Sequence, residues 1–256
     1  MRRAAAHRAA LRGPSLTDRA APLPHDPAGA DALSGQIAGE LETDIVFGRL
    51  RPGQKLPEEE LAERFSATRH QVREALLRLE RIGIVVKERN KGVTVRRFSI
   101  EEVGEIYEVR EILQRHAALR IPLPAPKASI AVLEAIHVEY EGAVARGDFH
   151  AIQKSNDRFH TELFRLCGNE VLAQLVKQYM DLSYAIRANA FSDPEHLVSA
   201  RREHLVMISL LSTRDSWSLS QLCVDHIQHS KQQYLAMLQR EAGAGGQRGE
   251  KTNGGE

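Results

Sequence analysis

The sequence predicts a mainly α-helical protein in two parts: three helices with a β-hairpin, followed by an all-helical bundle of six to seven helices. Over most of the chain, apolar residues recur at the three- and four-residue spacing of a buried helix face. Two short β-branched runs, at 84–86 and 93–95, flank a polar turn and predict the hairpin. The 256 residues are enough for two hydrophobic cores.

Composition divides the chain into four segments. Residues 1–32 are rich in Ala, Arg and Pro without a period, and we expect a disordered arm there. The Gly-rich end, residues 241–256, is expected to be a flexible tail. Between these segments we expect one folded domain over residues 33–98 and a second over residues 99–240.

The first domain begins with a helix in which Ile37, Leu41 and Ile45 share one face. A second helix starts at Pro57, where three successive glutamates complement the helix dipole. Thr68 can cap a third helix, and the hairpin follows it. Helix, turn, helix and a two-stranded wing, in that order, make a winged helix-turn-helix, which places its last helix in the major groove of DNA.

The charge of the chain is unevenly distributed. The net charge is only +1, which excludes a uniformly basic coat for nucleic acid. Residues 49–97, however, hold 13 Lys or Arg against 7 Glu, a local excess of +6 that suits a phosphate backbone. The first turn of the third helix adds side chains that bond base edges or phosphates, namely Thr68, Arg69, His70, Gln71 and Arg73. The alternative is an ordinary solvated helix start.

The second domain, residues 99–240, shows no strand pattern of weight. A capping box at Ser99 and Glu102 begins its first helix. Further helical patterns follow at about 127–145, 148–166, 170–190, 194–213 and 215–239. Because the connections between these patterns are short, we expect the helices to pack as a bundle.

Histidines are the chemical signal of this second domain. Asn156 and His160 lie about one helical turn apart on the same face. His204 and His226 each lie beside apolar residues on a later helix. Three imidazoles and a side-chain oxygen that converged inside the bundle would bind a divalent metal ion. The alternative is that each histidine is a hydrogen-bonded core residue.

Several classes of protein are disfavoured. Cys167 and Cys223 both lie in helical patterns, which argues against a disulfide-stapled secreted domain. No apolar run approaches the ~20 residues that span a bilayer. No hydrophobic stretch follows Arg2 and Arg3, so the N-terminus does not have the pattern of a signal peptide. We therefore expect a cytoplasmic protein with no membrane partner.

The run LPEEELAERFSATRHQVREALLRLERIGIVV, residues 56–86, resembles the N-terminal domain of GntR-type bacterial transcription regulators. The matching pieces are Pro52-Gly53, Leu56 to Ala62 and Thr68 to Leu76. The resemblance implies that Arg69 and Arg73 contact DNA, and that Gly92 lies at the wing tip beside the minor groove. The expected DNA-binding set is Arg51, Thr68, Arg69, His70, Gln71, Arg73, Lys91 and Gly92.

Residues 100–235 resemble the FCD ligand-binding domain that follows the winged helix in the FadR branch of the GntR superfamily. The matching pieces are Tyr107 to Arg110, Asn156 to His160, Gly168-Asn169, Glu203-His204 and Asp225 to Ile227. The resemblance implies a divalent metal ion (zinc, nickel or manganese) bound by Asn156, His160, His204 and His226. Asp157 would point about 100° away on a regular helix, and His229 is the alternative ligand to check.

The nature of these ligands predicts the effector. Neutral ligands would leave the double positive charge of the metal in place, and Arg110 would add to it. A positive, partly dry pocket favours a small carboxylate that completes the coordination of the metal. The expected effector-binding residues are Tyr107, Arg110, Arg187 and Asn189. Gln114 stands where the family usually has a glutamate, which leaves the identity of the effector open.

Together these expectations describe a homodimeric transcription regulator that binds a palindromic double-stranded DNA operator and senses a small carboxylate. Release from DNA by the effector, as in a repressor, is the usual expectation, and an activator is the alternative. We expect no enzymatic activity, because Asp157, the one candidate general base beside the ligands, faces away from them. A metal-dependent enzyme on the helical bundle is one alternative. A constitutive DNA binder whose metal is purely structural is the other.

Overall fold

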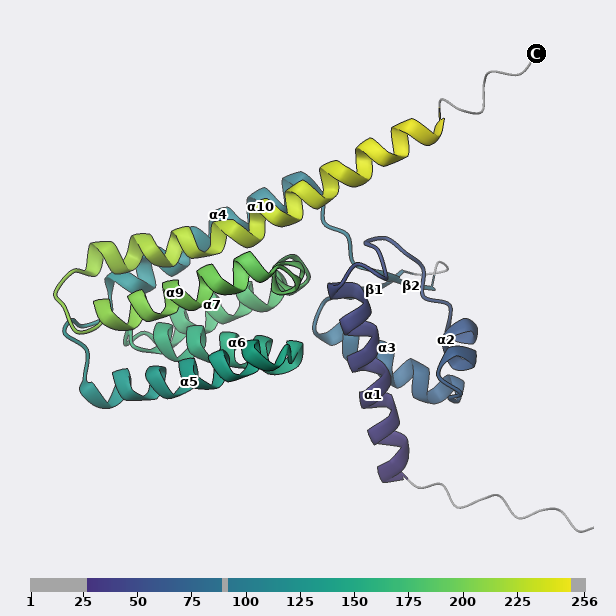
Figure 1. Cartoon of the computed structure of the whole chain (residues 1–256), viewed down its shortest axis with the longest axis horizontal. Helices are drawn as coiled ribbons and strands as arrows, with labels where there is room; N and C mark the ends of the chain where they lie inside the picture. Colours follow the sequence, from purple (N-terminus) through teal and green to yellow (C-terminus); the bar gives the residue numbers. More distant parts are fainter. Residues whose placement is uncertain (1–26, 89–91, 250–256) are drawn as a thin grey trace, which may run out of the picture.

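The computed structural model describes residues 27–88 and 92–249, which form two bodies side by side (Figure 1). The elements of the first body are α1 (Pro27–Val46), α2 (Glu58–Arg64), α3 (Arg69–Arg81), β1 (Val85–Glu88) and β2 (Gly92–Val95). The two strands pair antiparallel, with Val85 opposite Val95. This is the winged helix-turn-helix, and the mainly α-helical fold class is confirmed. Most of the expected arm and the wing residues 89–91, Lys91 among them, lie outside the described residues.

Local sequence positions α3, the last helix of the helix-turn-helix. Ser66, with a φ of 48°, makes the left-handed turn that separates α3 from α2. Thr68 caps α3: its hydroxyl accepts a hydrogen bond from the backbone N–H of Gln71 at 3.3 Å, and the side-chain oxygen of Gln71 accepts one from the backbone N–H of Thr68 at 2.9 Å. Gly83, with a φ of 81°, turns the chain away after α3.

The second body is an all-helical bundle in which the first and last helices, α4 and α10, run side by side (Figure 1). Its elements are α4 (Ile100–Leu119), α5 (Lys127–Arg146), α6 (Phe149–Arg165), α7 (Glu170–Leu182), α8 (Tyr184–Ala188), the 3-10 helix η1 (Asn189–Ser192), α9 (Pro194–Leu210) and α10 (Ser216–Gly249). No helix in the described part of the chain is both long and apolar enough to cross a bilayer.

The ends of the folded region differ from the prediction. Helix α1 begins at Pro27, several residues before the expected start of the domain, because proline fits the first turn of a helix. Helix α10 continues to Gly249, beyond the expected start of the tail at residue 241. Glycine weakens a helix by only about 1 kcal/mol per residue, so a long helix can continue through a Gly-rich segment.

The single helix expected over residues 170–190 is also wrong, because the chain breaks at Ser183 into α7, α8 and η1. The Ser183 hydroxyl donates to the carbonyl of Tyr179 at 2.8 Å, which competes with continuation of the helix. The guanidinium of Arg187 then donates to the carbonyl of Met180 at 3.1 and 3.2 Å. A side chain from α8 thus caps the end of α7.

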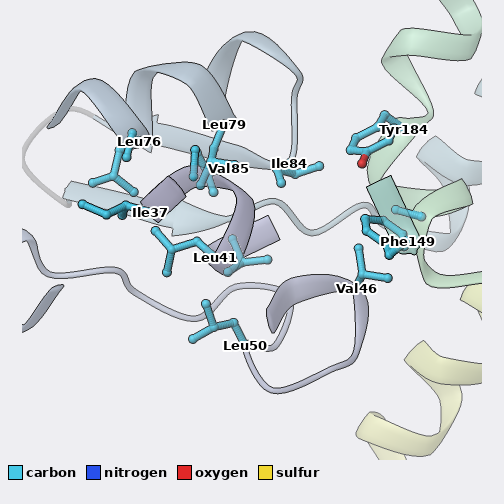
Figure 2. Packing of buried hydrophobic residues seen from close by; sticks show 14 of the residues in the cluster. Ile37, Leu41, Val46, Leu50, Leu76, Leu79, Ile84, Val85, Phe149 and Tyr184 are labelled. Carbon is cyan, nitrogen blue, oxygen red and sulfur yellow. The ribbon is translucent and has the colours of Figure 1, made fainter. Parts of the chain in front are cut away.

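Helix α1 belongs to the cores of both bodies. On one side, Ile37 and Leu41 pack against Leu76 and Leu79 of α3 (Figure 2). At its C-terminal end, α1 reaches Phe149 and Tyr184 of the bundle, and the buried residues form one continuous cluster. The winged domain is therefore packed against the bundle as well as linked to it by the chain.

Candidate functional site

The first turn of α3 presents two exposed arginines. Arg69 has 63% of its side chain exposed and Arg73 has 60%. Each is bonded to a glutamate in the first turn of α2, Arg69 to Glu59 and Arg73 to Glu58, both at 2.6 Å. Both arginines therefore face solvent at the N-terminus of the helix that winged domains place in the major groove.

The other expected DNA-binding residues are distributed around this turn. His70 is exposed, whereas Thr68 and Gln71 are engaged in the cap of α3. Arg51 is exposed in the turn before α2, where its backbone N–H donates to the side chain of Gln54 at 3.0 Å. That turn is bonded to the wing through the N–H of Gly53, which donates to Val95 at 2.9 Å. Gly92 begins β2 with a φ of 84°.

Three of the four expected metal ligands meet inside the bundle. His160 of α6, His204 of α9 and His226 of α10 are all buried. The Nε2 atom of His160 lies 3.1 Å from that of His226 and 3.3 Å from that of His204. We call these three residues the histidine cluster. Phe159 stacks on the His204 ring, with a centroid separation of 4.3 Å, and helps to fix its orientation.

The histidine cluster fits a divalent metal ion. Burial first, and then the neighbouring imidazoles, hold the pKa values of His160 and His204 well below their usual range, so both rings are neutral and keep a lone pair. Two nitrogens that each bind one ion at about 2.0–2.1 Å, with an angle of about 90° to 109°, lie about 2.9–3.4 Å apart. The separations of His160 from His226 and from His204 fall in this range, and the three ligand atoms all lie within 4.8 Å of one another.

Glu203 orients one member of the histidine cluster. Its carboxylate lies 2.5 Å from Nδ1 of His226, so that nitrogen carries the hydrogen and Nε2 faces the cluster with its lone pair. Glu203 also accepts a hydrogen bond from Ser199 at 2.9 Å. Burial opposes ionisation of Glu203, but the bond from His226 and that from Ser199 hold its pKa below the usual value. In the sequence, only the family resemblance singled out Glu203. Its role could not be seen there, because its partner His226 lies on another helix.

The fourth expected ligand, Asn156, is buried in the wall of the same cavity. Asp157 does not line the cavity, as its place on the helix predicted. Instead it accepts a hydrogen bond from Arg187 at 2.7 Å and a longer one from the Asn156 amide at 3.4 Å. Arg187 does line the cavity, so the Asp157 carboxylate helps to fix the position of a cavity residue without lining the cavity itself.

Arg110 is the unusual residue of this wall. Only 3% of it is exposed, and its Nε and Nη1 atoms have no hydrogen-bond partner among the described residues. Burial lowers its pKa to about 10, so it remains charged at neutral pH. Tyr107 lies outside the cavity lining, with its ring 4.8 Å from the guanidinium and its hydroxyl 2.8 Å from Ser230. Tyr107 therefore supports Arg110.

Two other residues that were expected at this site lie elsewhere. Asn189 does not line it, because η1 turns the side chain toward α10, where the amide lies 2.8 Å from the sulfur of Met237. His229, the alternative ligand, is outside the histidine cluster and stacks on His196 at 4.7 Å. His196 itself lines the cavity and was missed. Its spacing gave no clear signal, because His196 and His204 are eight positions apart and therefore point about 80° apart around a regular helix.

One short segment, α8 with η1, touches both the cavity and the winged domain. Arg187 and Phe191 line the cavity. Tyr184, on the same segment, donates a hydrogen bond to the buried carboxylate of Glu42 in α1. Phe191 lies 6.1 Å from Phe149, a member of the shared core. A change in the cavity therefore has a short physical route to α1.

Comparison with known proteins matches both bodies. Residues 33–95 match the family model described as bacterial regulatory proteins, gntR family. Residues 105–229 match the FCD domain, which covers the histidine cluster and Arg110.

Individual relatives agree with these matches. The chain is 29% identical to the Nta operon transcriptional regulator of Aminobacter aminovorans, over 75% of this chain and 90% of that one. It is 30% identical to the HTH-type transcriptional regulator LutR of Bacillus subtilis, over 54% and 69% of the two chains. The solved structure of E. coli McbR/YncC aligns with 82% of this chain and 98% of its own, with a TM-score of 0.52 and 22% identity, which shows a shared fold.

Proposed function

Because this chain belongs to the GntR family of bacterial transcriptional regulators and carries an FCD domain, we propose that it is a homodimeric repressor whose operator affinity is controlled by a small carboxylate bound at a metal ion. An operator on bacterial DNA would place it in the cytoplasm.

The DNA-reading surface supports the first part of the proposal. Arg69 and Arg73 are exposed at the start of α3, and residues 49–97 carry a local excess of positive charge. Arginine at this position can bond guanine bidentately or bind phosphate. A single recognition helix reads only a few base pairs, so two-fold pairing of chains on a palindromic operator supplies the remaining specificity.

The histidine cluster supports the metal. His160, His204 and His226 would hold the ion through their Nε2 atoms, and the buried Asn156 stands one turn before His160 to add an oxygen. Zinc, nickel and manganese all accept imidazole ligands. When bound, the ion would supply a positive centre that attracts and orients a carboxylate.

The observation that carries the proposed effector is the state of Arg110. A charged guanidinium with two unbonded nitrogens is costly to bury unless a partner arrives. Burial, His226 and Arg187 lower the pKa of the His160 imidazole, and Arg110 is near enough for its charge to add to them. An anion bound here would satisfy Arg110 and lie beside the histidine cluster.

The proposal is tested first by metal content. We expect inductively coupled plasma mass spectrometry to find about one metal ion per chain in the native full-length protein. His160→Ala should lose it, and His116→Ala, a change at an exposed histidine of α4, should retain it. Equal metal content in the native protein and His160→Ala would contradict the metal site.

DNA binding is tested separately, with a double-stranded site selected by the native protein from a random library. Fluorescence anisotropy should give tight binding of two chains per palindromic site, and a panel of small carboxylates should contain at least one that weakens it. A selected site that binds one chain would contradict the homodimer. Operator affinity that no carboxylate changes would contradict effector control.

A further inference from the structure

The cavity beside the histidine cluster has an unbalanced charge. Arg110 and Arg187 both line it, and among the described residues no Asp or Glu does. The acids nearby are already engaged: Asp157 is bonded to Arg187 at 2.7 Å, and Glu203 to His226 at 2.5 Å. Arg187 is thus neutralised locally, whereas Arg110 is not.

Two buried amides in the wall leave this imbalance uncorrected. Asn156 and Gln114 are both buried in the wall, and both are amides where a carboxylate would fit the same space. Gln114 follows Arg110 by one turn of α4, so the two side chains are neighbours on one face. A glutamate at 114 would pair with Arg110 inside the protein. Glutamine leaves the guanidinium charge uncompensated and adds an N–H donor of its own.

A single carboxylate cannot compensate both positive centres. One carboxylate carries one negative charge, while a divalent ion held by neutral histidines, the charged Arg110 and the Glu203 carboxylate together carry about two positive charges, 2 + 1 − 1. We propose that the effector is a small dicarboxylic acid, with one carboxylate directed to the histidine cluster and the other bound by Arg110 and Gln114. This inference rests on the proposed function, because it assumes an acid effector in this cavity.

The wall of the cavity agrees with a small diacid. Phe191, Met180 and Ile227 contribute apolar wall between the polar groups. That wall suits the short carbon chain that separates two carboxylates.

The test compares acids of equal length in metal-loaded full-length protein. Isothermal titration would use malonate against propionate, succinate against butyrate, and glutarate against valerate. We expect at least one diacid to bind about tenfold more tightly than its monoacid partner, because a hydrogen bond to a charged group contributes on this scale. Equal affinity within every pair would overturn the inference and leave a monocarboxylate effector standing. Absence of binding by all six acids would instead count against the proposed effector itself.

A matched pair of variants locates the second carboxylate. Gln114→Glu adds a negative charge beside Arg110 without a change of size, and it should reduce diacid affinity about tenfold while monoacid affinity holds. Gln178→Glu makes the same change at an exposed position of α7 and should behave as native. Arg110→Gln should likewise remove the preference for a diacid over its monoacid partner. This second variant keeps the test decisive if Gln114→Glu fails to fold. A diacid preference that survives both cavity variants would overturn the inference.

Discussion

The chain uses arginine in two opposite environments. Arg69 and Arg73 on α3 are more than half exposed, and each is bonded to a glutamate of α2. Arg110 in the bundle is 3% exposed, and two of its nitrogens have no hydrogen-bond partner in the part of the chain that the structure describes. The exposed arginines remain hydrated, so their charge costs the folded protein little free energy, and salt screens each of them. They suit a long polyanion that contacts both arginines together.

The buried Arg110 is suited to a small anion instead of a long one. Its charge is unscreened by water, so a single small anion can interact with it strongly. The same burial makes its surroundings part of the core, since the cavity wall includes residues of the hydrophobic clusters. We therefore expect changes on α3 to alter DNA binding with little effect on stability, and changes near the cavity to alter both stability and ligand binding.

The largest contrast should appear in stability. Phe159 is fully buried and stacks on His204, so Phe159→Ala should lower the free energy of unfolding by about 3–5 kcal/mol. Arg69→Ala should change it by less than about 0.5 kcal/mol. Urea unfolding of the metal-free protein measures both values. A comparable loss of stability in Arg69→Ala would break the distinction between the two regions.

The next contrast separates metal binding from DNA binding. Glu203→Gln removes the charge that orients His226, so metal affinity should fall about 10- to 100-fold. Competition with a chromophoric chelator measures the affinity, and Glu195→Gln, at an exposed position on the same helix, is the control. Operator affinity of the metal-free protein should not change. Unaltered metal affinity would remove Glu203 from the site.

A smaller effect tests the segment between the two regions. Tyr184→Phe deletes the hydroxyl that bonds Glu42, which we expect to leave effector affinity unchanged and to reduce the effector-induced change in operator affinity about fivefold. Anisotropy titrations with and without the effector give both numbers. Tyr179→Phe, a half-buried tyrosine of α7, serves as the control. If the two variants respond alike, the route through α8 is not the one used.

The smallest effect concerns the exposed ion pairs. Glu59→Gln frees Arg69 from its partner and should raise affinity for random-sequence DNA about twofold at low salt. The gain should shrink as salt is added, because the pair is exposed. A salt series of anisotropy titrations checks this, with Glu105→Gln on α4 as an exposed control. A gain that persists at high salt would point to a cause other than this pair.

The recognition helix was predictable because its signals are local. The Thr68 cap acts within a few residues, and it appears in the structure where the sequence placed it. Ser183 shows the limit of the same reasoning: apolar periodicity continued through it, while the break is stabilised by Arg187 reaching back to the Met180 carbonyl. Periodicity does not contain that contact.

The cavity was predictable only in part. Spacing along α6 placed Asn156 and His160 on one face, but the convergence of His160 with His204 and His226 depends on how three helices pack. That grouping came from family resemblance. Neither source indicated that Glu203 would orient His226, or that Asn189 would turn toward α10, because both depend on tertiary contacts.

The shared core around α1 has a consequence for the geometry of DNA recognition. A winged domain on a loose tether would let its helix search many positions, and half-site spacing would depend on the DNA. Here Leu41 packs toward α3 while the C-terminal end of the same helix reaches Phe149 and Tyr184 of the bundle. In the proposed homodimer, this packing would hold each winged domain at a fixed position on its bundle. The number of base pairs between half-sites would then be set by protein packing far from any base.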